Sequence, residues 1–134
     1  MTSTFADTVY FIALLNPRDQ FHHAALRHTA SFQGRMKTTA WVMTEVANQM
    51  SRPPNRASFL ALLHDLAASS SLDIVPPSIE LYEEGLRLYT AREDKEWSLT
   101  DCISFIVMEQ GGIVEALTAD HHFEQAGFTM LLDG

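Results

Sequence analysis

The sequence has a single cysteine, no long apolar segment and no signal-like start. Because Cys102 is the only cysteine, no disulfide can form within the chain, which fits a reducing compartment. Its apolar stretches fall well short of the roughly 18 residues that a membrane helix needs. The first residues also lack the basic-then-apolar order of a secretory signal. We therefore expect a cytoplasmic protein with no membrane association.

Basic residues are also scarce. Nine Lys and Arg stand against 17 Asp and Glu, which gives a formal net charge of −8. A nucleic-acid-binding protein usually carries a basic face. Here only two pairs, Arg52 with Arg56 and Arg92 with Lys95, suggest small basic patches, and an ordinary solvated surface is the better explanation of both pairs. The abundant acids therefore need an explanation of their own.

The hydrophobic pattern predicts an α/β fold in a single domain over residues 1–134. The chain has enough apolar material for one core, at 46% hydrophobic residues. Strands are predicted at residues 5–6, 36–39, 72–75, 116–119 and 128–132. Helices are predicted at residues 8–15, 19–32, 40–50, 55–69 and 98–111, with a short helical turn at 120–125. This alternation indicates a mainly parallel sheet with helices on both faces.

A further long helix is predicted between Ser78, its N-cap, and the polar residues 93–96. Its spacing places Ile79, Tyr82, Leu86 and Tyr89 on one side, and we expect this stripe to face the core.

Acidic residues stand at the positions where this fold would build a site. Asp7 directly follows the first strand and Asp120 a later one, and parallel strands present their carboxyl ends at one edge of the sheet. Asp101 begins an almost wholly apolar helix, where a buried carboxylate needs a compensating partner. Glu45 lies one turn into the helix after the second strand and can face the same edge. Taken singly, Asp7 in a turn, or Asp101 and Asp120 as helix caps, are equally good interpretations.

Converging carboxylates without matching Lys or Arg would repel one another unless a cation neutralised them. Oxygen ligands favour Mg²⁺ or Mn²⁺ over zinc, and no histidine pair has the spacing of a zinc hydrolase. A contact between substrate and His121 or His122 stays open. Cys102 lies among apolar residues and is expected to be a buried hydrophobe rather than a nucleophile.

Four segments together resemble the PIN domain family, in particular its bacterial VapC-type ribonucleases. They are residues 5–8, 44–48, 98–105 and 117–123, and residues 126–128 follow in the same context. The resemblance implies a three-layer α/β/α domain. The resemblance also implies that four residues of this sequence form a catalytic metal site and that three more support it. The four are Asp7, Glu45, Asp101 and Asp120, and the three are Thr8, Thr100 and Ser104.

Such a domain would cleave RNA with a metal-activated water, using Mg²⁺ or Mn²⁺. Arg52, Arg56, Arg92 or Lys95 could guide the RNA backbone. The resemblance also implies a homodimer and an antitoxin partner, because VapC-type domains are toxins of toxin–antitoxin pairs. Two alternatives stay open: a stand-alone nuclease of RNA processing, and a noncatalytic module that binds an ion or a protein on the same fold.

Overall fold

The computed structural model describes residues 3–132. Its sheet has five parallel strands in the order β3-β2-β1-β4-β5. The strands are β1 (Ser3–Ala6), β2 (Arg35–Thr39), β3 (Leu72–Val75), β4 (Glu115–Leu117) and β5 (Thr129–Met130). The helices are α1 (Thr8–Leu15), α2 (His22–Ser31), α3 (Ala40–Gln49), α4 (Pro53–Ala68), α5 (Ile79–Ala91), α6 (Leu99–Gln110) and α7 (His121–Gln125).

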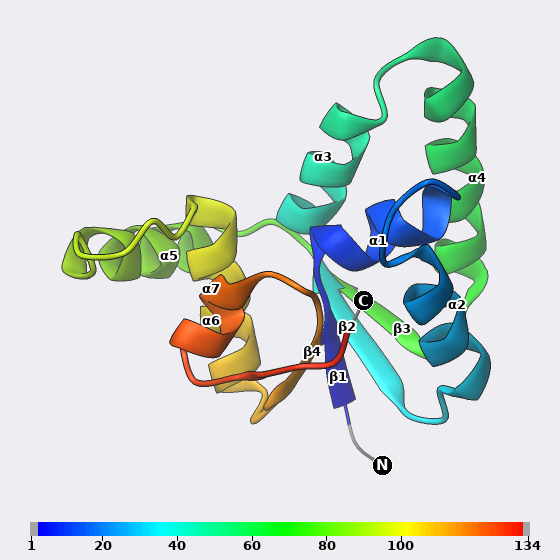
Figure 1. Ribbon diagram of the computed structural model, residues 1–134. Coiled ribbons are helices and arrows are strands. Elements are labelled where there is room, and N and C mark those ends of the chain that lie inside the picture. Colours follow the sequence, from blue (N-terminus) through cyan, green and yellow to red (C-terminus); the bar gives the residue numbers. More distant parts are fainter. Residues whose placement is uncertain (1–2, 133–134) are drawn as a thin grey trace.

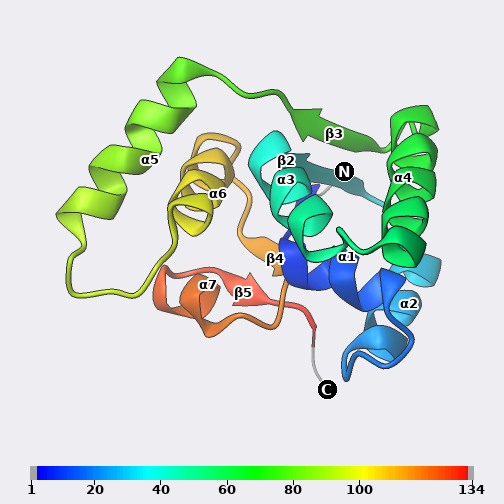
Figure 2. The same cartoon turned by 90° about the horizontal axis from the view of Figure 1, so that it is seen from above.

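The helices form a layer on each side of the sheet. In Figure 1, α1, α2 and α4 lie to the right of the strands, while α5, α6 and α7 lie to the left. Seen from above in Figure 2, α3 lies between the two groups, and it contacts both α1 and α6. The predicted α/β fold with a parallel central sheet and three layers is therefore confirmed. None of the described helices has the length and apolarity to span a membrane.

The central strand β1 is buried along most of its length. Thr4, Phe5 and Ala6 all lie inside, because helices cover both faces of a parallel sheet at its centre. The helix α6 is likewise buried on nearly every side, as its uniform apolarity predicts. β1 and α6 thus bring the acids at their ends, Asp7 and Asp101, into the interior of the protein.

Several predicted boundaries move by a few residues. The second helix begins at His22 rather than at residue 19, because the carboxylate of Asp19 accepts a hydrogen bond from the Phe21 amide and closes a turn (2.8 Å). The fourth begins at Pro53, since proline suits the first helical turn, where its missing N–H is not needed. The last two strands are shorter than predicted, at three and two residues.

The predicted inner face of α5 is wrong. Ile79 is 72% exposed, Tyr82 and Tyr89 are about half exposed, and Leu86 is half-buried. Leu81 and Leu88 pack against the core instead.

The reason lies at Gly85, which is buried between α5 and α6. A Cβ at this position would lie 2.4 Å from Cγ1 of Ile103. The two helices therefore approach most closely at a residue without a side chain, and the bulkier aromatic face of α5 is turned outward.

Candidate active site

The strand β1 ends at Ala6, so Asp7 lies at the carboxyl edge of the sheet, as predicted. Asp120 reaches the same edge from β4, after a short turn. Thr118 joins the two. Its hydroxyl donates to Oδ2 of Asp7 (2.8 Å) and accepts a hydrogen bond from the Asp120 amide (3.0 Å). Neighbouring strands from opposite ends of the chain thus bring these two acids together.

Asp7 is the most buried of the acids, with 3% of its surface exposed. It occupies the N-cap position of α1, but its side chain makes no capping hydrogen bond. Burial raises the pKa of its carboxyl from 3.8 to about 7, and the charges of Asp101 and Asp120 add to this effect, while the hydrogen bond from Thr118 opposes it. The buried Asp7 carboxylate therefore lowers the stability of the folded protein. Helix capping does not explain why an acid occupies this position.

Asp101 lies at the start of α6 and forms a capping box with Ser98. Its Oδ2 accepts from the Ser98 amide (3.2 Å), and its own amide donates to the Ser98 hydroxyl (3.0 Å). The capping interpretation is thus confirmed. The same carboxylate also faces His122, whose Nδ1 lies 3.0 Å from Oδ2. Burial raises the pKa of Asp101, which means that the cap and the histidine compensate this carboxylate only in part.

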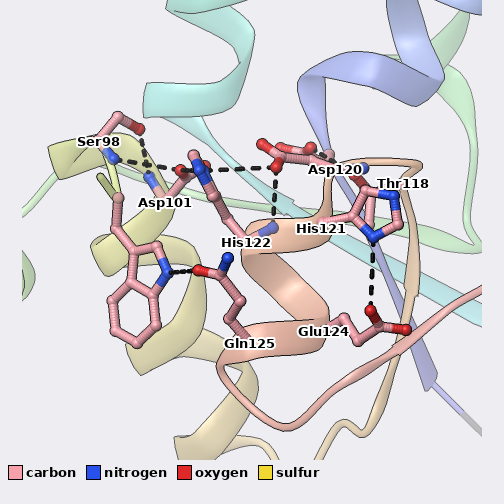
Figure 3. Close-up of polar contacts among 10 residues, drawn as sticks. Ser98, Asp101, Thr118, Asp120, His121, His122, Glu124 and Gln125 are labelled. Atoms are coloured by element: carbon pink, nitrogen blue, oxygen red, sulfur yellow. Dashed lines mark hydrogen bonds and ion pairs between the residues drawn. The ribbon is translucent and has the colours of Figure 1, made fainter. Parts of the chain in front are cut away.

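Asp120 caps the short helix α7, since its Oδ1 accepts from the His122 amide (2.9 Å). The His122 ring bends back over this cap, and Nδ1 lies 3.4 Å from the same oxygen. Figure 3 shows the ring between the carboxyl groups of Asp101 and Asp120. One ligand atom from each of these three residues lies within 4.8 Å of the others, so a single cation could contact all of them.

Glu45 lies on α3 and is held by Thr8, whose hydroxyl donates to its Oε1 (2.5 Å). Thr8 follows Asp7 directly, so this bond ties α3 to the carboxyl end of β1. The structure therefore brings all four predicted acids to one region, with Glu45 attached through Thr8.

The other predicted supporting residues differ in their contacts. Thr100 is half-buried, and no hydrogen bond joins it to the four acids within residues 3–132. Ser104 is fully buried one turn after Asp101, and its hydroxyl has no partner among the described residues. A buried polar group without a partner is unusual and points to a bound water or ion.

Two residues of the site were not predicted. Thr118 had no assigned role, although its place two residues before Asp120 is typical of a hydroxyl that binds a backbone amide in a turn. His122 was considered only for a substrate contact. Its contact with Asp101, 21 positions away in the chain, has no signal in local sequence spacing.

The carboxylates lack a Lys or Arg counterpart in the described part of the chain. No Lys or Arg of the described residues forms an ion pair with Asp7, Glu45, Asp101 or Asp120. The buried Asp7, the unpartnered Ser104 hydroxyl and the shared contacts of His122 together fit a divalent cation at this edge of the sheet.

The family model of the PIN domain matches residues 4–129. The chain belongs to the PIN domain family. It is 30% identical over 125 residues to the 23S rRNA-specific endonuclease VapC20 of Mycobacterium tuberculosis, and the match covers 92% of this chain and 94% of that protein. The family predicted from the four segments is thereby confirmed.

Solved structures agree with this assignment. The crystal structure of M. tuberculosis VapC20, described as a sarcin–ricin loop cleaving toxin, matches with a TM-score of 0.88 and 27% identity, and the match covers 97% of this chain and 99% of that one. A toxin–antitoxin complex from Klebsiella pneumoniae matches with a TM-score of 0.63 at 17% identity, covering 88% and 87% of the two chains. FitAcB from Neisseria gonorrhoeae matches with 0.65 at 16% identity, covering 97% and 96%. The last two matches support the fold alone.

Proposed function

We propose that this PIN domain is a metal-dependent endoribonuclease, with residues 1–134 as one catalytic domain in the cytoplasm. The observation that carries the proposal is the mutually repelling set of the buried Asp7 and Asp101 and the half-buried Asp120, which lacks a Lys or Arg partner among residues 3–132. A divalent cation would remove this repulsion. A relative with the same fold over nearly its whole length is an RNA endonuclease.

The proposed site holds Mg²⁺ or Mn²⁺ on Asp7, Asp101 and Asp120, with Glu45 completing the set. When bound, such an ion acidifies the attacking water and neutralises charge on the scissile phosphate. Thr118 orients the Asp7 carboxylate, and the Ser98 amide orients that of Asp101. The Thr8 hydroxyl holds Oε1 of Glu45, and in this proposal the other oxygen, Oε2, takes a proton or a water. The chain's own residues thus position acids that would otherwise move apart.

The RNA would approach past Lys95. This residue lines a hollow of about 360 Å³ together with Asp94, Glu96, Gln125 and His122, and His122 connects the hollow to the candidate site. Arg92 is less available to RNA. Its Nε and Nη2 each donate a hydrogen bond to the carboxylate of Asp94 (3.0 Å each), and its guanidinium lies over the Trp97 ring.

The other basic pair lies elsewhere. Arg52 and Arg56 stand at the start of α4, where Arg56 binds the Ser51 carbonyl. Of the four basic candidates, Lys95 is therefore the residue that we propose for a phosphate contact near the acids.

VapC20 is specific for 23S rRNA and cleaves the sarcin–ricin loop. We propose a structured ribosomal RNA loop as the first substrate class to test. By the same likeness we propose that the chain is the toxin of a toxin–antitoxin pair, that it dimerises, and that an antitoxin covers its active site. Induced expression should then arrest growth, and coexpression of the protein encoded next to it should relieve the arrest.

The central test is cleavage of purified 23S rRNA by the purified chain in Mg²⁺ or Mn²⁺. Asp7→Asn and Asp101→Asn should each lower the rate by on the order of 100-fold or more, and a chelator should abolish cleavage. Asp73→Asn is the matched control, because Asp73 is an exposed carboxylate on β3 that pairs with Lys37. This variant should cleave like the wild type.

Equal cleavage by all variants would mean a contaminating nuclease and would refute the assignment. Cleavage of other RNAs without growth arrest would favour a stand-alone processing nuclease. Absence of cleavage with any RNA would favour a noncatalytic binding module.

A further inference from the structure

We propose that His122 is a nitrogen ligand of the metal, together with Asp101 and Asp120, so that the site is not made of oxygen atoms alone. The inference rests on the metal site of the proposed function, but it makes no use of RNA cleavage.

The distances around His122 match those between neighbouring ligands of one ion. Nδ1 lies 3.0 Å from Oδ2 of Asp101 and 3.4 Å from Oδ1 of Asp120. Two ligands at right angles, each about 2.1 Å from an ion, lie about 3 Å apart. The two contacts of Nδ1 therefore fit neighbouring ligand positions around one cation, and the three ligand atoms all lie within 4.8 Å of one another.

The backbone also fixes the position of His122. Its amide donates to Oδ1 of Asp120, and the next residue, Phe123, is fully buried and packs against Phe5 and Phe105. The His122 side chain is 29% exposed. The imidazole is thus anchored from the interior while its ring remains open to an entering ion.

The preceding histidine offers a direct contrast. His121 points away from the acids toward Glu124, at 3.4 Å, and its side chain is 76% exposed (Figure 3). The two histidines are adjacent residues of the same helix, but only His122 faces the carboxylates of Asp101 and Asp120. His121 is therefore the matched control for His122.

A different explanation is that His122 only forms an ion pair with Asp101 and Asp120. This pairing leaves Asp7 buried beside both carboxylates without a positive partner in the described chain. A metal held by these three ligand atoms adds positive charge next to Asp101 and Asp120, the two carboxylates whose charges act on Asp7. The ligand role therefore accounts for more of the site than the ion pair does.

A nitrogen ligand changes the expected metal preference. Imidazole suits transition metals, whereas Mg²⁺ prefers oxygen atoms and water. We expect the wild-type chain to bind Mn²⁺ more tightly than Mg²⁺ by on the order of 10-fold or more.

The test is Mn²⁺ binding to the full chain without RNA, followed by electron paramagnetic resonance. Titration gives the affinity, and electron spin-echo modulation detects a nitrogen nucleus bonded to Mn²⁺. We expect this nitrogen signal in the wild type and in His121→Ala. In His122→Ala the signal should disappear and the affinity should fall by on the order of 10- to 100-fold.

His122→Asp provides the complementary variant, because it replaces nitrogen by oxygen. This variant should retain Mn²⁺ binding without the nitrogen signal. The ratio of its Mn²⁺ affinity to its Mg²⁺ affinity should be smaller than in the wild type. Metal-free thermal unfolding of each variant checks that the fold is kept.

A wild-type complex without nitrogen coupling, or unchanged affinity in His122→Ala, would overturn the ligand role. If Mn²⁺ binding is also unchanged in Asp101→Asn and Asp120→Asn, the metal site of the proposed function fails as well. If binding depends on both acids but not on His122, only the present inference fails.

Discussion

Replacing Asp7 by asparagine should stabilise the metal-free protein above neutral pH. The folded state holds the Asp7 proton up to about pH 7, whereas the unfolded chain releases it near the ordinary aspartate pKa of 3.8. Since the unfolded state binds fewer protons in this range, the stability contributed by Asp7 falls as the pH rises from about 4 to about 7. Asparagine is nearly the same size, can still accept from Thr118, and has no charge to bury.

The size of the effect follows from the two pKa values. At about 1.4 kcal/mol per pH unit, the interval from 3.8 to about 7 corresponds to about 4 kcal/mol at pH 8. At pH 5 the burial of Asp7 would lower the free energy of unfolding by only about 1 to 2 kcal/mol. The folded carboxyl is still protonated at this pH, and the remaining cost reflects the ionisation of Asp7 in the unfolded chain. The advantage of Asp7→Asn over the wild type should therefore grow by about 2 to 3 kcal/mol between pH 5 and pH 8.

Urea unfolding at the two pH values, with a chelator present, measures this difference. Asp73→Asn should follow the wild type at both pH values, because Asp73 is exposed. Addition of Mn²⁺ at pH 8 should stabilise the wild type more than Asp7→Asn, since a bound ligand stabilises the state that binds it. Parallel pH dependence of wild type and Asp7→Asn, or a loss of stability in the variant at pH 8, would refute the burial argument.

Three further predictions concern other residues. Gly85→Ala should destabilise the fold by about 1 to 3 kcal/mol in urea unfolding, because its methyl group would meet Cγ1 of Ile103, and the same change should cost less in an Ile103→Ala background, which lacks that atom. Thr118→Val should lower RNA cleavage by on the order of 10-fold, while Thr118→Ser should keep most of it, because only the hydroxyl holds Asp7; equal rates in the two variants would contradict this role. Cys102 should react with a thiol reagent only after unfolding, because it is fully buried and burial raises its pKa to about 11, so rapid labelling of the native protein would be inconsistent with the structure.

The sheet and the acids at its edge could be predicted because they depend on local patterns. A short apolar strand followed by Asp7, and an apolar helix that begins with Asp101, are both visible in the sequence. The rule that parallel strands present their carboxyl ends at one edge then brings these acids together. The interpretations of Asp101 as a cap and as a buried acid of the site were not true alternatives, since the same carboxylate caps α6 and faces His122.

The face of α5 and the roles of Thr118 and His122 could not be predicted in the same way. The apolar pattern of α5 offers two stripes, and the choice between them depends on how closely α6 approaches at Gly85. His122 and Thr118 act through residues far away in the chain. Such contacts depend on how helices and strands pack against one another. The spacing of residues within a single helix or strand carries no information about this packing.

The bond between Thr118 and Asp7 joins residues 111 positions apart. During synthesis Asp7 is made first, and its partner strand β4 follows more than 100 residues later. At about 5 to 20 residues per second, this interval is roughly 6 to 22 seconds. A nascent or truncated chain that stops before Thr118 therefore has no assembled acidic site, and the complete set of acids can form only after Asp120 and His122 have left the ribosome.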